Sequence, residues 1–189
     1  DLRFDVDAGD LALLRENARG QLRARGAIRD GTPWPALQLD ATGSNIVWDR
    51  LAIGAVTAKV DYEARDRGRA DVSVLARMLR VGERSADSLQ LSSNGTAGSH
   101  RVTMQLRAPQ LQLTAAGDGA LNGGVWQWAI SELRAEDGRD LQLALEAPAL
   151  LRVSADESTL ERLCLHGTQS HICATGSDRD GVRNATLSA

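Results

Sequence analysis

The residues best suited to chemistry lie in one stretch, CLHGTQSHIC, which holds both cysteines and two of the three histidines of the 189-residue chain. A hairpin centred on Gly167–Ser170 would pair His166 with His171 and Cys164 with Cys173. Because successive side chains of a strand point to opposite faces, these four would then share one face of the hairpin. The stretch therefore predicts a metal site, a reactive cysteine or a closed hairpin.

Three kinds of site compete for this stretch. Zinc uses two cysteines and two histidines as ligands, but four ligands on one flat face converge poorly on a tetrahedron. A catalytic Cys–His pair lacks an evident orienting acid, and redox dithiols are usually more closely spaced. Directly opposed cysteines are close enough for a cross-strand disulfide, which requires an oxidising compartment. We favour a disulfide between Cys164 and Cys173, with zinc, a reactive cysteine and free thiols as the alternatives.

Elsewhere the chain offers little for catalysis. The motifs GxSxG, HExxH and GxGxxG and the P-loop are absent, and the carboxylates are scattered. The glycine-rich GDGALNGG at 117–124 lacks a lysine, and we interpret it as a loop between strands. We expect no catalytic residue, no cofactor and no metal ion.

Three further ring side chains could bind a ligand. His100 opens an alternating segment, and we expect it to be structural. Trp126 and Trp128 are two residues apart and so share one face of a strand. They either pack against an apolar interior, which we favour, or form a platform on which a sugar stacks. The second possibility would make the chain a closed β-sandwich module for adhesion or carbohydrate binding.

Strict alternation of apolar and polar residues dominates the chain and predicts half-buried β-strands, most clearly in RVTMQLRA at 101–108. Turn signals such as NG at 94–95 and DG at 137–138 indicate a long, mostly antiparallel meander. Two segments, 10–17 and 74–81, have helix-like spacing and predict one or two short helical turns. The candidate residues of the apolar face are Leu22, Ile28, Leu37, Leu39, Val56, Val60, Leu89, Leu91, Val102, Met104, Leu106, Leu111, Leu113, Leu141, Leu143 and Leu145.

Composition indicates what such a face would bind. Hydrophobic residues make up 42% of the chain and aromatic residues 3%, so the apolar surface is built from aliphatic side chains, which suit acyl chains better than sugars or nucleotides. From pattern alone, a sandwich that buries this face is favoured over a single curled sheet that lines a groove with it. The net charge of −3 and the interspersed Arg and acidic residues argue against nucleic-acid binding.

The ends of the chain suggest a piece of a larger protein. It begins at Asp1 in mid-pattern, and no apolar run approaches the ~20 residues that cross a bilayer. We expect residues 1–189 to form a single β-rich segment of a larger protein, and any anchor or targeting signal of that protein would lie outside it.

Three segments resemble the TamB family, the inner-membrane-anchored part of the bacterial translocation and assembly module, within the AsmA-like group of bridge-type lipid carriers. They are LSSNGTAGSHRVTMQL, GGVWQWAISEL and LEAPALLRVSADESTLERLCLHGTQSHICATG, within about residues 87–177. Residues 10–48 fit more loosely, and Trp128 stands where the family usually has glycine. The likeness is to the C-terminal region of the family, so we expect a C-terminal-region fragment. The matching positions are Gly95, Thr96, His100, Trp126, Ile130, Leu133, Pro148, Ala149, Cys164, Leu165 and Cys173.

The resemblance implies a fold and a function. The fold is all-β, a long sheet curled into an open apolar trough called a β-taco, which reverses the preference for a sandwich. The full-length protein would be anchored in the inner membrane of a Gram-negative bacterium, lie in the periplasm and work with a BamA-like outer-membrane barrel protein of the TamA type. The oxidising periplasm supports the Cys164–Cys173 disulfide, with the two histidines as incidental neighbours.

The function implied is physical and not enzymatic. We expect this segment to act in outer-membrane biogenesis by shielding apolar cargo in a hydrophobic groove. The cargo would be phospholipid acyl chains, nascent outer-membrane β-barrel strands, or both.

Overall fold

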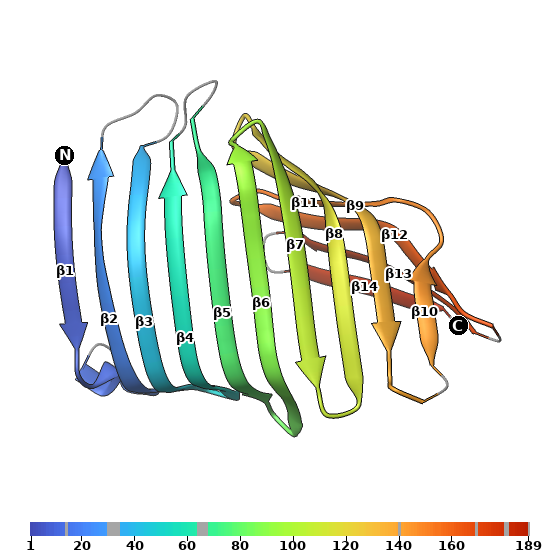
Figure 1. Cartoon of the computed structure of the whole chain (residues 1–189), viewed down its shortest axis with the longest axis horizontal. Coiled ribbons are helices and arrows are strands. Elements are labelled where there is room, and N and C mark those ends of the chain that lie inside the picture. The colour runs from blue at the N-terminus through green and yellow to red at the C-terminus, as the bar shows by residue number, and fades with distance from the viewer. Residues whose placement is uncertain are drawn as a thin grey trace. The chain divides into compact units, whose positions relative to one another are not determined.

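Within the residues that it describes, the computed structural model has fourteen β-strands and one short 3-10 helix. The strands form one antiparallel sheet in chain order from β1 to β10 and then β12, β13 and β14, while β11 pairs with β9 and β12 (Figure 1). This confirms the predicted all-β fold with a long antiparallel sheet and is consistent with a trough. The chain divides into two compact units, which we describe separately. The described residues are 1–13, 15–29, 35–63, 68–139, 141–168, 170–179 and 182–188.

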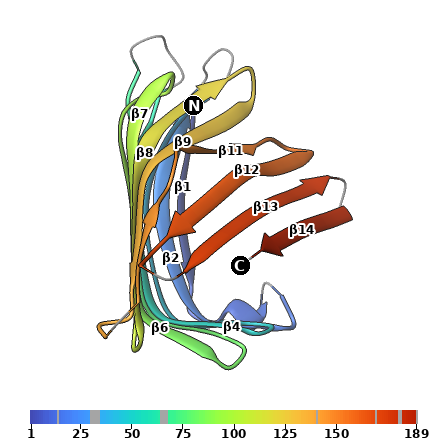
Figure 2. The same ribbon diagram turned by 90° about the vertical axis from the view of Figure 1, so that its right-hand side faces the viewer.

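Unit 1 comprises residues 1–97 and 105–109. Each of its strands β1–β6 pairs antiparallel with the next along the chain. The 3-10 helix η1 (Leu11–Leu13) is the first of the expected helical turns, and Figure 2 shows the strands bending over at the end that carries it. The strands are β1 (Leu2–Ala8), β2 (Ala18–Arg29), β3 (Ala36–Trp48), β4 (Leu51–Tyr62), β5 (Ala70–Val81) and β6 (Arg84–Thr96).

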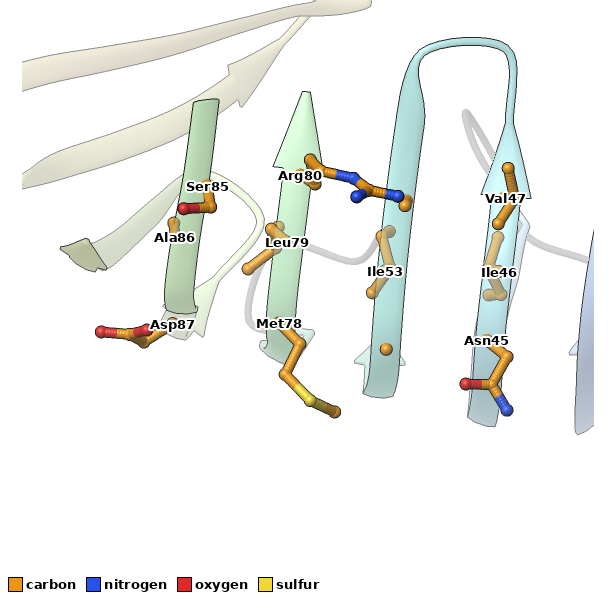
Figure 3. Close-up of a pocket in the computed structure, with 12 residues that line it drawn as sticks. Asn45, Ile46, Val47, Ile53, Met78, Leu79, Arg80, Ser85, Ala86 and Asp87 are labelled. Carbon is orange, nitrogen blue, oxygen red and sulfur yellow. The ribbon is translucent and has the colours of Figure 1, made fainter. Parts of the chain in front are cut away.

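A row of irregular positions crosses β2–β6 near this end, and we call it the crease. In the β4–β5 pair, the regular pairing stops at Ala55 with Arg77 and resumes at Ile53 with Leu79. The same interruption occurs between β3 and β4 and between β5 and β6. Between β2 and β3 the register shifts, because Gly20 alone lies opposite Asn45 and Ile46. The crease consists of Gly20, Asn45, Gly54, Met78 and Asp87, one residue from each strand, and Asn45, Met78 and Asp87 can be followed across Figure 3.

At the crease, the alternation of side chains between the two sides of the sheet shifts by one residue. The backbone is left-handed at Asn45 (φ 51°) and Met78 (φ 52°), conformations that L-residues seldom adopt within a strand. A Cβ atom on Gly43 would lie 2.7 Å from Ile46 Cδ1 and 3.0 Å from Val56 Cγ1, so these two side chains meet over Gly43. Ile46 lies beyond the crease and Val56 before it. The apolar face is therefore continuous across the crease.

The helical turn expected at 74–81 is wrong, because these residues lie in β5 and pair with both β4 and β6. Val74 and Ala76 belong to the apolar face, and the next apolar-face residue is Leu79 because Met78 occupies the crease. This shift of one residue produced the helix-like spacing in the sequence.

Unit 2 comprises residues 98–104 and 110–189, so β7 (Ser99–Ala108) belongs to it up to Met104. Its strands pair antiparallel. In Figure 1, β10 runs beside β9, whereas β11–β14 run at a steep angle to it. The remaining strands are β8 (Leu111–Asn122), β9 (Val125–Glu136), β10 (Gln142–Leu145), β11 (Ala149–Val153), β12 (Glu157–His166), β13 (His171–Arg179) and β14 (Val182–Ser188).

Strands β10 and β11 are two halves of an interrupted strand, because both pair with β9 and with β12. The interruption covers Glu146–Pro148, and a proline cannot donate a ladder hydrogen bond. The backbone N–H of Glu146 still donates to the carbonyl oxygen of Cys164 at 3.0 Å. The break therefore releases the Glu146 side chain from the sheet pattern but keeps it beside β12.

The expected loop at 117–124 is mostly strand, since β8 continues to Asn122 and only the two glycines after it form the turn. Gly119 lies against the ring of His100, and a Cβ atom there would collide with that ring. Glycine in a strand often marks a place where a neighbouring group approaches closely, and Gly119 has that role here.

Candidate functional site

The predicted lining residues of β2–β6 all fall on one side of the unit 1 sheet, which we call the unit 1 apolar face. The register places them in rows across the strands: Leu39 pairs with Val60, which pairs with Val72. Each row continues the apolar surface over neighbouring strands. Its predicted members are Leu22, Ile28, Leu37, Leu39, Val56, Val60, Leu89 and Leu91.

The opposite side of the unit 1 sheet is charged. The guanidinium of Arg23 lies 3.2 Å from the Asp7 carboxylate, and the ammonium of Lys59 lies 3.7 Å from the Asp40 carboxylate. These side chains are 58–75% exposed, so the ion pairs contribute little to stability and mark this side as the one that faces water.

The unit 1 apolar face is only half-buried. Its predicted lining side chains are all of intermediate exposure, and the apolar residues of unit 1 that are described as fully buried are alanines. Unit 2 differs, because Ile130 and Leu133 of β9 are 4% and 8% exposed. Unit 2 thus has a packed core, whereas unit 1 presents large aliphatic side chains that remain partly accessible.

Tyr62 is a partly buried aromatic residue of this surface. It pairs with Leu37 on one side and Ala70 on the other, so its ring lies at the end of an apolar row. Burial raises the pKa of its hydroxyl above 10, because removal from water disfavours the phenolate.

A cavity of about 450 Å³ lies along the crease and is drawn in Figure 3. Its apolar lining includes Ile46, Ile53 and Leu79, while Arg80 and Asp87 supply charges. The volume is within the ~300–1,000 Å³ range of small-molecule sites. The cavity lies in unit 1, next to the apolar rows.

The predicted lining residues outside β2–β6 have mixed environments. Val102 and Leu143 are 2% and 6% exposed and belong to the core of unit 2. Leu106, in the part of β7 assigned to unit 1, is half-buried. The other predicted residues are also half-buried and lie in unit 2: Met104, Leu111, Leu113, Leu141 and Leu145.

Trp128 is a packing residue, as favoured from the sequence, because it is only 7% exposed. Trp126 is half-buried, and its indole N–H donates to Nε2 of the buried His100 at 3.0 Å. The ring centroids of the two tryptophans are 6.3 Å apart. With one ring buried and the other hydrogen-bonded inside unit 2, the pair does not form the exposed platform that sugar stacking requires.

The hairpin of β12 and β13 has the predicted register, with Cys164 opposite Cys173 and His166 opposite His171. The structure joins the cysteines by a disulfide, and both are buried. Nε2 of His171 lies 3.6 Å from Cys173 Sγ. His166 is exposed and is not part of this group.

Two charged residues that sequence reasoning missed complete this cluster. Arg162 Nε donates to Cys164 Sγ at 3.2 Å from a bulge in β12, where the register shifts between Leu160 and Leu163. The Glu146 carboxylate lies 3.0 Å from His171 Nε2, and this hydrogen bond lowers the pKa of the carboxyl. Neither contact has a local sequence signal, because one depends on a bulge and the other on the break between β10 and β11.

The family model described as TamB, N-terminal domain, matches residues 1–182, which is nearly the whole chain. The chain belongs to the TamB family. No curated protein and no solved structure matches it.

The TamB match confirms the family but corrects the expected position. The sequence segments suggested the C-terminal region, whereas the matching model is that of the N-terminal domain. The physical reason is that alternating strands and glycine turns recur throughout this chain. Such features report the architecture of a TamB-like sheet and not the place of a segment along it.

TamB-family membership sets the broad function. TamB proteins act in outer-membrane biogenesis as non-enzymatic, bridge-like transport proteins, and generally work with TamA, a BamA-like partner. They are anchored in the inner membrane and span the periplasm. Among the described residues of this chain, no helix has the length and apolarity needed to cross a bilayer.

Proposed function

We propose that the unit 1 apolar face binds phospholipid acyl chains and shields them from water, without chemical catalysis. One observation carries this proposal: large aliphatic side chains lie in aligned rows on one side of the sheet and stay half-exposed, while the other side is charged. Burial of these partly exposed aliphatic side chains against an apolar ligand is favourable by ~25 cal/mol per Å² of buried apolar surface.

The dimensions of the face suit a lipid tail. The strands β2–β6 lie ~4.8 Å apart, so the face is on the order of 19 Å wide, and the rows from Leu37 to Gly43 cover ~20 Å along β3. One leaflet of a bilayer is ~15 Å thick in its hydrocarbon part. An acyl chain as disordered as in a bilayer leaflet therefore fits on the face without leaving it.

The energetics favour a carrier over a tight binding site. Each methylene removed from water contributes ~0.8 kcal/mol, so a dozen contribute on the order of 10 kcal/mol before the ordering cost is subtracted. Side chains of nearly uniform Leu, Val and Ala type provide no strong local minimum. A bound chain can then slide along the face while its head group stays in water.

The same face suits the apolar side of a nascent barrel strand, which is the second cargo that the sequence suggested. We place lipid first because the face is smooth, aliphatic and poor in aromatic side chains. We further propose that the chain acts in the periplasm, in an inner-membrane-anchored protein that works with a TamA-type barrel partner; family membership supports this.

Crosslinking in cells tests the proposal. A photo-reactive amino acid at Leu39, on the apolar face, should capture phospholipid, whereas the same group at the adjacent and exposed Gln38 should not. Mass spectrometry of the adducts identifies the cargo. Equal labelling at both positions refutes the proposal, and adducts with outer-membrane proteins alone would replace lipid by nascent strands.

A charge placed on the face provides a second test. Leu39→Arg should abolish function in cells while circular dichroism shows a folded chain, and Gln38→Arg should leave function intact. If Leu39→Arg prevents folding, the face is a closed core and the proposal fails.

A further inference from the structure

We propose that reduction of the Cys164–Cys173 disulfide converts the β12–β13 hairpin into a zinc site, with Cys164, Cys173, His171 and Glu146 as the four ligands. This inference does not depend on the proposed cargo function. It rests on a cluster in unit 2 in which two sulfurs and an imidazole nitrogen converge, with a carboxylate hydrogen-bonded to the imidazole.

Three of the four donor atoms already lie close together. The Sγ atoms of the two cysteines and a ring nitrogen of His171 all lie within 4.8 Å of one another. In a tetrahedral site with Zn–S of ~2.3 Å and Zn–N of ~2.0 Å, sulfur and nitrogen are ~3.5 Å apart. The observed distance from Cys173 Sγ to His171 Nε2 is 3.6 Å. This pair therefore needs almost no rearrangement.

Glu146 supplies the fourth ligand, in place of the His166 that the sequence suggested. Its carboxylate oxygen lies 3.0 Å from His171 Nε2, against ~3.4 Å for two such ligands on one zinc ion. Its backbone N–H is fixed on the Cys164 carbonyl oxygen. The set no longer lies on one flat two-stranded face, because Glu146 approaches from the break between β10 and β11. This removes the geometric objection to zinc.

The charges balance in the reduced, zinc-bound form. Two thiolates and one carboxylate carry three negative charges, and Zn²⁺ and the Arg162 guanidinium carry three positive ones. Arg162 donates from Nε to Cys164 Sγ at 3.2 Å and also lies 3.8 Å from Cys173 Sγ through its terminal nitrogen. Hydrogen bonds of this kind to ligating thiolates support the metal from outside its ligand shell.

The cluster is also accessible to an ion. Both cysteines are buried, but the side chains of His171 and Glu146 are 54% and 52% exposed. Zinc can therefore enter from the His171 and Glu146 side and meet the sulfurs behind them.

The chemical steps balance. A dithiol reductant donates two electrons and two protons, so the S–S bond breaks, two thiols form and the dithiol becomes a disulfide. Zinc then replaces both thiol protons, which pass to solvent, and two Zn–S bonds form. The hairpin is thereby closed in either redox state, by a covalent bond when oxidised and by a metal when reduced.

Zinc titration of the intact chain tests the site. The protein is reduced anaerobically with a phosphine, which becomes the phosphine oxide, and titrated with Zn²⁺ against a chromophoric chelator. We expect one zinc per reduced chain and none for the oxidised chain. His171→Ala and Glu146→Gln should each weaken binding at least tenfold, and Arg162→Ala should weaken it ~10–100-fold. His166→Ala is the matched control and should change the affinity less than twofold.

The absorption of Co²⁺ in place of Zn²⁺ gives an independent readout, because thiolate ligands and tetrahedral geometry have distinct bands. Reduced wild-type protein that binds no more metal than Cys164→Ser/Cys173→Ser overturns the proposal. A His166→Ala effect as large as that of His171→Ala also overturns the ligand set. So does a reduced chain that is unfolded and stays unfolded when zinc is added.

Discussion

Substitution of Met78 tests the crease in the unit 1 sheet. Met78 lies within β5 but has φ of 52°, in the left-handed region. That conformation costs an ordinary L-residue ~1–2 kcal/mol, and a β-branched side chain tolerates it least. In a regular strand, valine would be neutral or stabilise by up to ~1 kcal/mol relative to a flexible residue. The left-handed backbone at the crease therefore makes Met78→Val destabilising, whereas the same substitution in a regular strand would be neutral or stabilising.

We expect Met78→Val to lower the free energy of unfolding by about 1–2 kcal/mol. Met78→Gly should lie within ~1 kcal/mol of wild type, since relief of the left-handed backbone offsets the ~0.5–1 kcal/mol entropy cost of glycine. Arg77→Val, one residue away, exposed and regularly paired, is the control and should be neutral or stabilising. Urea and thermal unfolding followed by circular dichroism measure all three.

A double-mutant cycle examines the same row from β4. A methyl group on Gly54 would lie 2.9 Å from Met78 Cβ and 2.5 Å from Met78 Cε, so Gly54→Ala should cost ~1–3 kcal/mol by overpacking. In the Met78→Gly background that cost should fall by at least ~0.5 kcal/mol, the coupling expected between contacting residues. A Met78→Val variant more stable than Met78→Gly, together with no coupling to Gly54, would refute the crease.

Three further predictions concern titration and the disulfide. The Asp137 carboxylate accepts hydrogen bonds from the backbone N–H groups of Arg139 at 2.8 Å and Leu141 at 3.0 Å, and these bonds lower the pKa of the carboxyl. The turn should therefore be stable at pH values above the ordinary carboxyl pKa and should loosen as the pH falls through the lower folded-state pKa. Amide exchange at Leu141 measures this loosening, and Asp137→Asn should abolish its pH dependence. Because the pKa of Tyr62 is raised in the folded protein, its contribution to stability is complete below pH ~10 and declines as the pH rises further. Ultraviolet titration should therefore show that Tyr62 ionises at a higher pH than free tyrosine. Tyr62→Phe should remove the part of the stability loss at alkaline pH that comes from this ionisation. The disulfide has a sequence separation of 9, for which loop-closure entropy gives a stabilisation of about 2–3 kcal/mol. Cys164→Ser/Cys173→Ser should therefore destabilise unit 2 by that amount when unfolding is measured in urea without metal. An unchanged urea midpoint would show that the pairing of β12 with β13 holds the hairpin without the disulfide.

Much of the fold could be predicted because strand signals are local. Alternation such as that around Leu37 and Leu39 assigned the strands and their apolar face, and the register confirms it. The prediction failed at 74–81, where Met78 shifts the alternation and mimics a helix. It failed again at Gly119, where glycine serves close packing against His100 and not a turn. In both places a contact between strands overrides the local pattern.

By itself, the sequence determined the class of fold, the aliphatic character of one sheet face and the opposition of Cys164 and Cys173, because each follows from residues that are neighbours along the chain. Only the tertiary structure decided that the crease aligns across five strands, and that one unit packs a core while the other leaves its apolar face half-buried. It also decided that Glu146 reaches His171 across 25 residues of sequence. These features depend on the register between strands, and a register is chosen by the summed pairing of whole strands and not by any local motif.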